Sequence, residues 1–289
     1  SIYQSNSNID VQLDTIKFKL DIKELSLFLE TKNPKVIYRN INIPVKNIKV
    51  YVNFLSIIKS DTKIEKINLI LNEISIKELK KLSVSFKPSN FTNLLNYKIT
   101  DGKLNTEIDI YFNDKNLIEN YIARGSVSEF KSNLLDEINL YNSSFTFFAD
   151  KTDILIQNFV GTTGPIKIHN GDLKFQLLPE ISIVTNFEAN INYKNNFQNY
   201  HNLIKKLSNI KNISDFDGNL LNNLSIKLDK TYKIKNYEFK SRGTVSRSTF
   251  NFNYPIKNLL LNEKIKSVSI ENSKFKINNN TFKKEFKIE

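Results

Sequence analysis

The chain has 289 residues and a net charge of +12, and it contains no cysteine, so disulfides, thiolate metal sites and cysteine nucleophiles are excluded. Its basic residues are dispersed singly or in doublets such as Lys80-Lys81, which favours a solvated sheet face over a nucleic-acid-binding patch, and we expect no nucleic acid partner. The hydrophobic fraction of 40% lies below the roughly 45 to 50% usual for soluble domains and argues against a parallel α/β core with strands buried on both faces.

Apolar and polar residues alternate at a spacing of two through most of the chain. Ile16, Phe18 and Leu20, for example, alternate with Lys17 and Lys19. Because successive side chains of a strand point to opposite faces, this pattern predicts strands with one apolar face and one polar face. The sequence therefore predicts a mainly β fold, and its function depends on what covers the apolar face.

The predicted strands begin near the amino terminus. Over the first hundred residues the pattern predicts strands at 9 to 22, 25 to 30, 35 to 43, 46 to 54, 64 to 71 and 82 to 87. Two apolar stretches, Phe54 to Ile58 and Ile76 to Leu82, are compact enough to form helical turns. From 104 to 193 the strands are separated by short turns rich in Asn, Asp and Gly, which is typical of an antiparallel meander.

A set of short motifs occurs twice in the same order. Asp101-Gly102, Arg124-Gly125 and Asn142-Ser143 recur as Asp217-Gly218, Arg242-Gly243 and Asn272-Ser273. Apolar residues at helical spacing precede both copies, as a short helix at Phe91, Leu94 and Leu95 and a longer one at Phe197, Tyr200, Leu203, Ile204, Leu207 and Ile210. We expect an amino-terminal β region at 1–87 and two helix-plus-meander repeats at 88–195 and 196–289, all in one continuous sheet. Because Asn, Ser and Lys are common in this chain, chance similarity is the alternative.

Residues that carry catalysis or bind metals are sparse. The two histidines, His169 and His201, do not stand at ligand spacing, and no nucleophile elbow, zinc-binding helix motif, P-loop or dinucleotide-binding glycine motif is present. The stretch from Gly161 to Gly164 precedes Pro165 and a strand, so a tight turn is favoured over a nucleic-acid clamp. We expect no enzyme, no catalytic residue, no metal and no cofactor. A glycosidase carboxylate pair brought together only by the fold is the alternative.

The stretch from Ile41 to Leu79 resembles the amino-terminal region of AsmA-like proteins. Its segment from Ile48 to Ile58 runs from a strand into an apolar turn, and Ile64 to Leu71 forms the next strand ahead of a short Leu-containing element. The membrane helix that begins the family's proteins is not in this chain. Later strands are similar to the TamB and YhdP branch of the same superfamily, and they are opened by Gly102, Gly125, Asn170-Gly171-Asp172-Leu173 and Gly243.

The resemblance implies a long antiparallel meander curled into an open groove, a shape called a β-taco, with one or two short amphipathic helices. In that family the apolar inner face carries phospholipid acyl chains between the inner and outer membranes of bacterial envelopes. The resemblance thus implies a non-enzymatic lipid conduit or carrier that contacts phospholipids and membranes. The candidate groove residues are Ile108, Ile110, Phe112, Phe145, Phe147, Ile154, Ile156, Leu173, Phe175, Phe187 and Ile191.

The resemblance also implies a periplasmic location with an anchor in the inner membrane. The sequence has no run of about 18 apolar residues, it lacks a start methionine and it opens within the strand pattern. We therefore expect the anchor to lie outside this chain.

A closed structural or adhesive protein would show the same alternation. In a sandwich or solenoid the apolar faces cover one another and bind no hydrophobic ligand. The two hypotheses differ in exposure, because an open groove presents an apolar patch beyond the few hundred Å² usual for monomers.

Overall fold

The computed structural model describes residues 9–21, 26–52, 63–83, 90–135, 138–177, 180–194, 210–229, 233–258, 263–281 and 284–288. Its first elements are β1 (Ile9–Gln12), β2 (Ile16–Asp21), β3 (Ser26–Lys32), β4 (Lys35–Tyr38), β5 (Ile41–Ile43), β6 (Val45–Val52), β7 (Ile64–Leu71), β8 (Ile74–Ser75), α2 (Ile76–Ser83) and α3 (Asn90–Tyr97). The strands that follow are β9 (Ile99–Phe112), β10 (Ile118–Leu135), β11 (Ile138–Ala149), β12 (Asp153–Thr163), β13 (Ile166–Gln176), β14 (Ile181–Lys194), β15 (Ile210–Leu228), β16 (Ile234–Asn258), β17 (Glu263–Asn280) and β18 (Lys284–Ile288).

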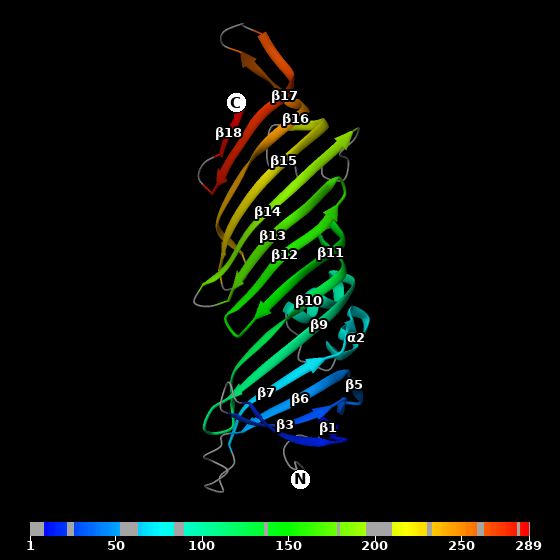
Figure 1. Ribbon diagram of the computed structural model, residues 1–289. Helices are drawn as coiled ribbons and strands as arrows, with labels where there is room; N and C mark the ends of the chain where they lie inside the picture. The colour runs from blue at the N-terminus through cyan, green and yellow to red at the C-terminus, as the bar shows by residue number, and fades with distance from the viewer. Residues whose placement is uncertain are drawn as a thin grey trace. The chain divides into compact units, whose positions relative to one another are not determined.

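These strands form one long antiparallel meander sheet and one small sheet (Figure 1). In the long sheet the strands follow sequence order from β18 back to β9 and continue through β7, β6 and β3 to β2, while β8 pairs with β9. The small sheet has the order β1-β4-β5. The sequence prediction of a mainly β fold built as an antiparallel meander is therefore confirmed.

The chain divides into two compact units. Unit 1 comprises residues 1–130 and 145–155, and unit 2 comprises residues 131–144 and 156–289. Within unit 1, β2, β3, β6, β7 and β9 are consecutive neighbours. Within unit 2, the long strands β13 to β17 lie side by side and β18 pairs with the end of β17 (Figure 1).

The helix α2 begins at a reciprocal hydrogen-bonded cap. The backbone N–H of Glu78 donates to Oγ of Ser75 over 3.3 Å, and the backbone N–H of Ser75 donates to a carboxylate oxygen of Glu78 over 2.9 Å. This capping box satisfies two backbone donors that the first turn leaves without helical partners. Ile76 and Leu82 are the buried apolar residues of α2, so the amphipathic helix is fixed at both of its ends.

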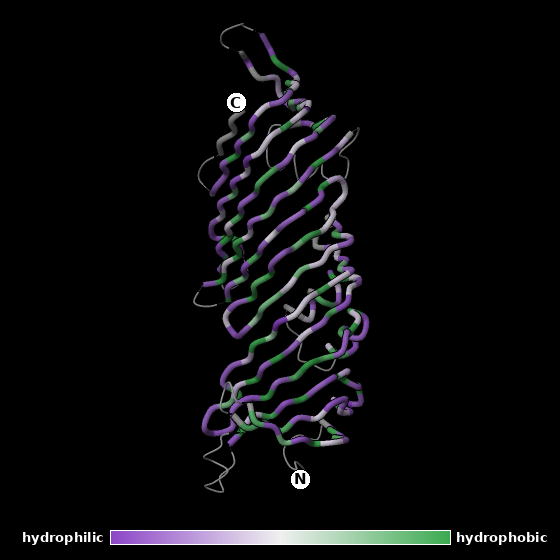
Figure 2. Tube along the Cα trace, viewed as in Figure 1, coloured by the Kyte–Doolittle hydropathy of each residue, from purple (hydrophilic) through white to green (hydrophobic). Residues whose placement is uncertain are grey.

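The register shows that each unit has one apolar and one polar sheet face. In unit 1 the pairs Leu29–Val50, Val50–Ile67 and Ile67–Ile110 connect four adjacent strands. In unit 2 the pairs Phe175–Ile183, Ile183–Ile226 and Ile226–Tyr237 do the same. Directly opposite residues of antiparallel strands share a face, so these rows are continuous apolar surfaces. The alternation of hydrophobic and hydrophilic residues along single strands is visible in Figure 2.

Residues with positive φ interrupt the spacing of two within several strands. In β17 the apolar positions Val268 and Ile270 are followed by Phe275, and Asn272 between them has a positive φ of 46°. Asn142 in β11 and Asn158 in β12 also have positive φ values within a strand. A left-handed residue changes which of the following side chains point to a given face, so the apolar series can resume on the same face after it. Asn tolerates this conformation better than most residues.

Several predicted boundaries differ from the structure. The expected strand at 9 to 22 is two strands, and the strand at 35 to 43 is divided by a turn at Arg39 and Asn40, both with positive φ. The expected strand at 82 to 87 is wrong at its start, because Leu82 and Ser83 belong to α2.

The short helix α2 agrees with the helical turn expected at Ile76–Leu82, and α3 agrees with the helical spacing at Phe91–Leu95. The helix expected at Phe197–Leu207 and the turn at Phe54–Ile58 lie outside the described residues, and Ile210 begins β15. The curling of the sheet, the repeats and their boundaries stay predictions.

Candidate functional site

The unit 1 apolar face consists of side chains from β2, β3, β6, β7 and β9. The predicted residues Ile108 and Ile110 lie opposite Leu69 and Ile67, and Phe112 follows at the same spacing. All three are half-buried. The face becomes more accessible toward β2, where Ile16, Phe18 and Leu20 are 54%, 70% and 61% exposed. A sheet face with side chains this accessible offers an apolar surface to a ligand.

The predicted residues of β11 and β12 also occupy strand positions separated by two. The ring of Phe145 meets that of Phe130 edge to face, with centroids 5.4 Å apart. Phe147 lies on the same face of β11 as Phe145, whereas the neighbouring Phe148 lies on the opposite face and is 38% exposed. In β12, Ile154 and Ile156 are both half-buried.

The unit 2 apolar face carries the remaining predicted residues. The register pairs Phe175 with Ile183, Phe187 with Gly171 and Ile191 with Ile166. Leu173 is paired with Thr185 on the same face. Leu173, Phe175, Phe187 and Ile191 are half-buried. Within unit 2, sequence alternation thus identified residues that share one face of β13 and β14, although their contact with a ligand stays a prediction.

One end of the unit 2 apolar face is filled by its own side chains. A cluster of buried residues comprises Tyr193, Phe216, Val245, Phe250, Ile270 and Phe275, none more than 8% exposed. These residues come from β14 to β17 and stabilise the pairing of those strands by apolar burial. The more accessible part of the face lies toward Ile183 and Ile226, at the other ends of β14 and β15, and toward Phe175 on the neighbouring β13.

The opposite face of unit 1 carries aromatic and charged side chains in contact. The rings of Phe28 and Tyr51 have centroids 5.2 Å apart. The Lys66 ammonium lies 4.3 Å from the centroid of Tyr51, within the range of a cation–π interaction. Phe28 and Tyr51 are each 8% exposed, so this polar face includes buried side chains that alternation alone assigns to water.

A buried polar network lies on this face of β7 and β9. The side-chain amide of Asn68 donates to Asp109 over 2.7 Å and to Glu107 over 2.6 Å. Arg124 from β10 forms ion pairs with both carboxylates, at 2.9 Å to Glu107 and 3.3 Å to Asp109. The hydrogen bond from Arg124, with a further one from Asn68, lowers the pKa of Glu107 below its usual value despite partial burial.

A second carboxylate on the same face is held in a similar way. Glu30 in β3 pairs with Lys19 in β2 and accepts a hydrogen bond of 2.9 Å from the amide of Asn47. The bond from Lys19 is the main reason that the pKa of Glu30 lies below its usual value. Sequence analysis missed both networks, because they depend on which strands become neighbours.

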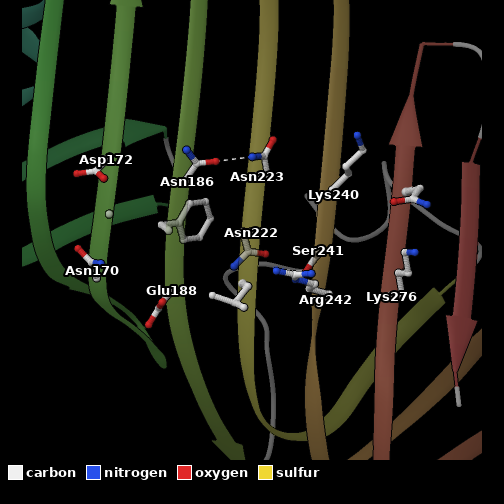
Figure 3. A pocket seen from close by; sticks show the side chains of 14 residues that line it. Asn170, Asp172, Asn186, Glu188, Asn222, Asn223, Lys240, Ser241, Arg242 and Lys276 are labelled. Atoms are coloured by element: carbon white, nitrogen blue, oxygen red, sulfur yellow. Dashed lines mark hydrogen bonds between the residues drawn. The ribbon is translucent and has the colours of Figure 1, made fainter.

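The polar face of unit 2 is hollowed over five strands, with a volume of about 590 Å³. Figure 3 shows Asp172 and Glu188 on β13 and β14 at one side of this hollow, and Lys240, Arg242 and Lys276 on β16 and β17 at the other. Between them the Asn223 amide donates a hydrogen bond to Asn186. This polar hollow could not be predicted from the sequence, because it depends on which strands lie side by side.

The described residues hold no group of three or more His, Cys, Asp or Glu side chains arranged to bind a metal ion. His169 is exposed on β13, and His201 lies outside the described residues. In the part of the chain that the structure describes, every helix is too short or too polar to cross a membrane.

Comparisons with protein-family models, with curated proteins and with solved structures find no match for this chain. The resemblance to AsmA-like proteins therefore stays a prediction from the residues that carry it.

Proposed function

We propose that the chain is a non-enzymatic lipid carrier or conduit that holds phospholipid acyl chains on the apolar face of its sheet. The observation that supports this proposal is the continuity of accessible apolar side chains across adjacent strands within each unit. In unit 1 the row from Phe18 through Leu29, Val50 and Ile67 to Ile110 crosses five strands without a charged residue.

The energetics of acyl-chain burial favour such a ligand. Each buried methylene contributes roughly 0.8 kcal/mol, so even a partly covered acyl chain gains several kcal/mol. Half-buried side chains such as Phe175 and Ile183 would lose further water contact beneath the ligand. A row without charged residues, such as that from Phe18 to Ile110 in unit 1, would also let the acyl chain slide along the face, as transport requires.

The wider role follows from the sequence resemblance. On this proposal the sheet curls so that its apolar face lines a groove, and phospholipids pass between the inner and outer membranes of a bacterial envelope. The protein would act in the periplasm, anchored to the inner membrane by a segment outside this chain. No reaction step or cofactor is part of the proposal.

One observation favours a different function. The buried cluster around Val245 and Phe250 shows that part of the unit 2 apolar face is covered by its own side chains. If such packing extended over the whole face, the protein would be a closed structural or adhesive β protein without a lipid ligand.

Mass spectrometry of an organic extract of the purified chain tests the proposal. We expect stoichiometric phospholipid, at a level well above that of an unrelated β-sandwich protein prepared in parallel. Phe147→Asp should remove most of this lipid, because it places a charge on the face that carries Phe145. Ile183→Asp should do the same in unit 2.

Two neighbouring positions provide matched controls. Phe148→Asp and Val184→Asp introduce the same charge one residue further along each strand, on the opposite face, where both native side chains are 38% exposed. Both controls should retain the lipid. Extracts that contain no phospholipid above the sandwich control, or equal losses in the two pairs of variants, would contradict a lipid-bearing apolar face.

A further inference from the structure

Two cations are held directly opposite each other on the polar face of unit 2. The register pairs Arg242 of β16 with Lys276 of β17. Like charges at directly opposed positions of antiparallel strands destabilise the sheet. Both side chains are exposed, and among the described residues neither forms an ion pair. Among the described side chains, this unfavourable pair therefore has no carboxylate within ion-pair distance. The next strand, β18, places Lys287 opposite Lys276 and Glu285 opposite Asn278.

The acidic side chains of the same polar hollow are too distant to neutralise this pair. On β15, next to Arg242, the register places the uncharged Leu221. Glu188 lies one strand further, on β14, which is roughly 10 Å from β16 at the usual strand spacing. Lys240 does have a partner, Glu238, at 2.8 Å on its own strand. The positive charge is thus concentrated at one side of the hollow.

In the first copy of the repeated motif the arginine is neutralised by carboxylates, whereas the second copy has no carboxylates at the equivalent positions. A Cβ on Gly125 would lie 2.0 Å from the carbonyl oxygen of Asn105, and a Cβ on Gly243 would lie 1.8 Å from that of Asn219. The two glycines therefore occupy equivalent positions against the preceding strand, and each is preceded by an arginine, Arg124 or Arg242.

This equivalence defines the positions that face each arginine. Two and four residues after Asn105 stand Glu107 and Asp109, both paired with Arg124. Two and four residues after Asn219 stand Leu221 and Asn223, which carry no charge. The second copy has the arginine of the first without its carboxylates.

Arginine is rare in this chain, and most of its arginines have a partner within the protein. Only four of its 42 basic residues are arginines, and three of them have a partner: Arg39 lies over the ring of Tyr38, Arg124 pairs with Glu107 and Asp109, and Arg247 pairs with Asp215. Arg242 has no such contact among the described residues. A guanidinium presents a planar fork of donors suited to two oxygens of a phosphate group, and an adjacent ammonium adds a second positive charge.

We infer that the polar hollow binds a phosphate-bearing anion through Arg242 and Lys276, with the Asn223 and Asn278 amides beside them. Its volume of about 590 Å³ accommodates a phosphate ester as well as free phosphate. The site lies on the face opposite to the proposed lipid surface. A test that excludes lipid binding on the apolar face would therefore leave the proposed anion site unaffected, and the reverse also holds.

Calorimetric titration of the full chain with inorganic pyrophosphate at fixed ionic strength tests this site. We expect saturable binding, weakened at least tenfold by the double variant Arg242→Gln and Lys276→Gln. The double variant Leu221→Glu and Asn223→Asp should weaken binding as strongly, because it restores the carboxylates that neutralise Arg124 in the first copy. Circular dichroism establishes that both variants are folded.

Arg247→Gln is the matched control, since it removes an exposed arginine of the same strand whose partner is Asp215. Its pyrophosphate affinity should stay within twofold of the native value. Absence of saturable binding by the native chain, or an equal loss in Arg247→Gln, would overturn the site. Saturable binding of a duplex oligonucleotide without binding of pyrophosphate would do so as well, in favour of a polyanion-binding surface.

Vesicle sedimentation identifies the source of the phosphate. Binding to phosphatidic acid vesicles, but not to phosphatidylcholine vesicles, with competition by pyrophosphate and loss in the Arg242→Gln and Lys276→Gln variant, would support a lipid headgroup. Pyrophosphate binding without vesicle binding would support a free phosphate ester in the same site.

Discussion

At the scale of single residues, the polar side of the sheet differs most from what its sequence suggests. Alternation assigns Asn68 and Asp109 to the solvated side, yet each is only 4% exposed. Their burial follows from the register of β7 and β9, which places them directly opposite each other. The spacing of residues along one strand carries no information about which strand lies beside it, so this network could not be predicted from the sequence.

Replacement of Asn68 by Ala should destabilise the protein by about 2 to 3 kcal/mol. The change removes two hydrogen bonds to carboxylates and leaves the buried Asp109 and the half-buried Glu107 less satisfied. The free energy of unfolding in urea measures the effect. Asn105→Ala is the control, because its exposed side chain makes one long contact of 3.4 Å to Glu73, and its loss should stay within about 0.5 kcal/mol. Equal losses would show that the buried network contributes nothing particular.

At the scale of strands and helices, local pattern was sufficient to predict most elements. Spacing of two predicted β7 with its correct ends, and the compact apolar stretch from Ile76 to Leu82 predicted a helical turn where α2 lies. The errors lie where a backbone conformation interrupts a continuing pattern. Apolar alternation continues from Val36 to Ile43, but the left-handed turn at Arg39 and Asn40 separates β4 from β5. A positive φ at a non-glycine residue is not signalled by the residue types around it, so the break between β4 and β5 could not be predicted.

Gly243 allows β16 to approach β15 closely, and this close approach can be tested by substitution. Gly243→Ala should destabilise the protein by about 2 to 3 kcal/mol, since its Cβ would lie 1.8 Å from the Asn219 carbonyl oxygen and the backbone must shift. Gly171→Ala is the control, with its nearest neighbour, Cβ of Phe187, at 3.3 Å, and we expect a change below about 1 kcal/mol. The urea midpoints of the two variants give the comparison. Similar midpoints would mean that the close approach at Gly243 does not constrain the fold.

At the scale of the whole molecule, the strand order has a thermodynamic consequence. Within the described chain the long sheet is a meander in which the extensive contacts are made between strands adjacent in the sheet order. Stability in such an array is approximately a sum of neighbour terms, as in repeat proteins. Disruption of one pair of strands is then expected to remain local.

Amide hydrogen exchange on Asn68→Ala measures this locality. Protection should fall in β6, β7 and β9, next to the substituted residue, while β15, β16 and β17 keep the protection of the native chain. The native chain at the same pH and temperature is the reference. A uniform fall across β15 to β17 would show that the sheet unfolds as one cooperative body.

The candidate lipid surface was predictable from sequence to the extent that it depends on faces. Leu173, Phe175 and Phe187 share a face because of strand geometry, and alternation encodes that geometry directly. The proposed phosphate site depends instead on a comparison between the two copies of the predicted repeat. Glu107 and Asp109 in one copy, against Leu221 and Asn223 in the other, were a usable signal once the glycines defined the alignment.

The linear order of the strands also bears on how such a protein can change over evolution. A meander gains a hairpin without rearranging the strands already present, and each added pair of strands widens the sheet by roughly 10 Å. Duplication of a unit such as that ending at Asn142-Ser143 would therefore widen the sheet while each unit keeps its own side-chain contacts. On the predicted duplication, the residues beside the two arginines have diverged: Glu107 and Asp109 neutralise Arg124, whereas Leu221 and Asn223 leave Arg242 to the proposed anion site.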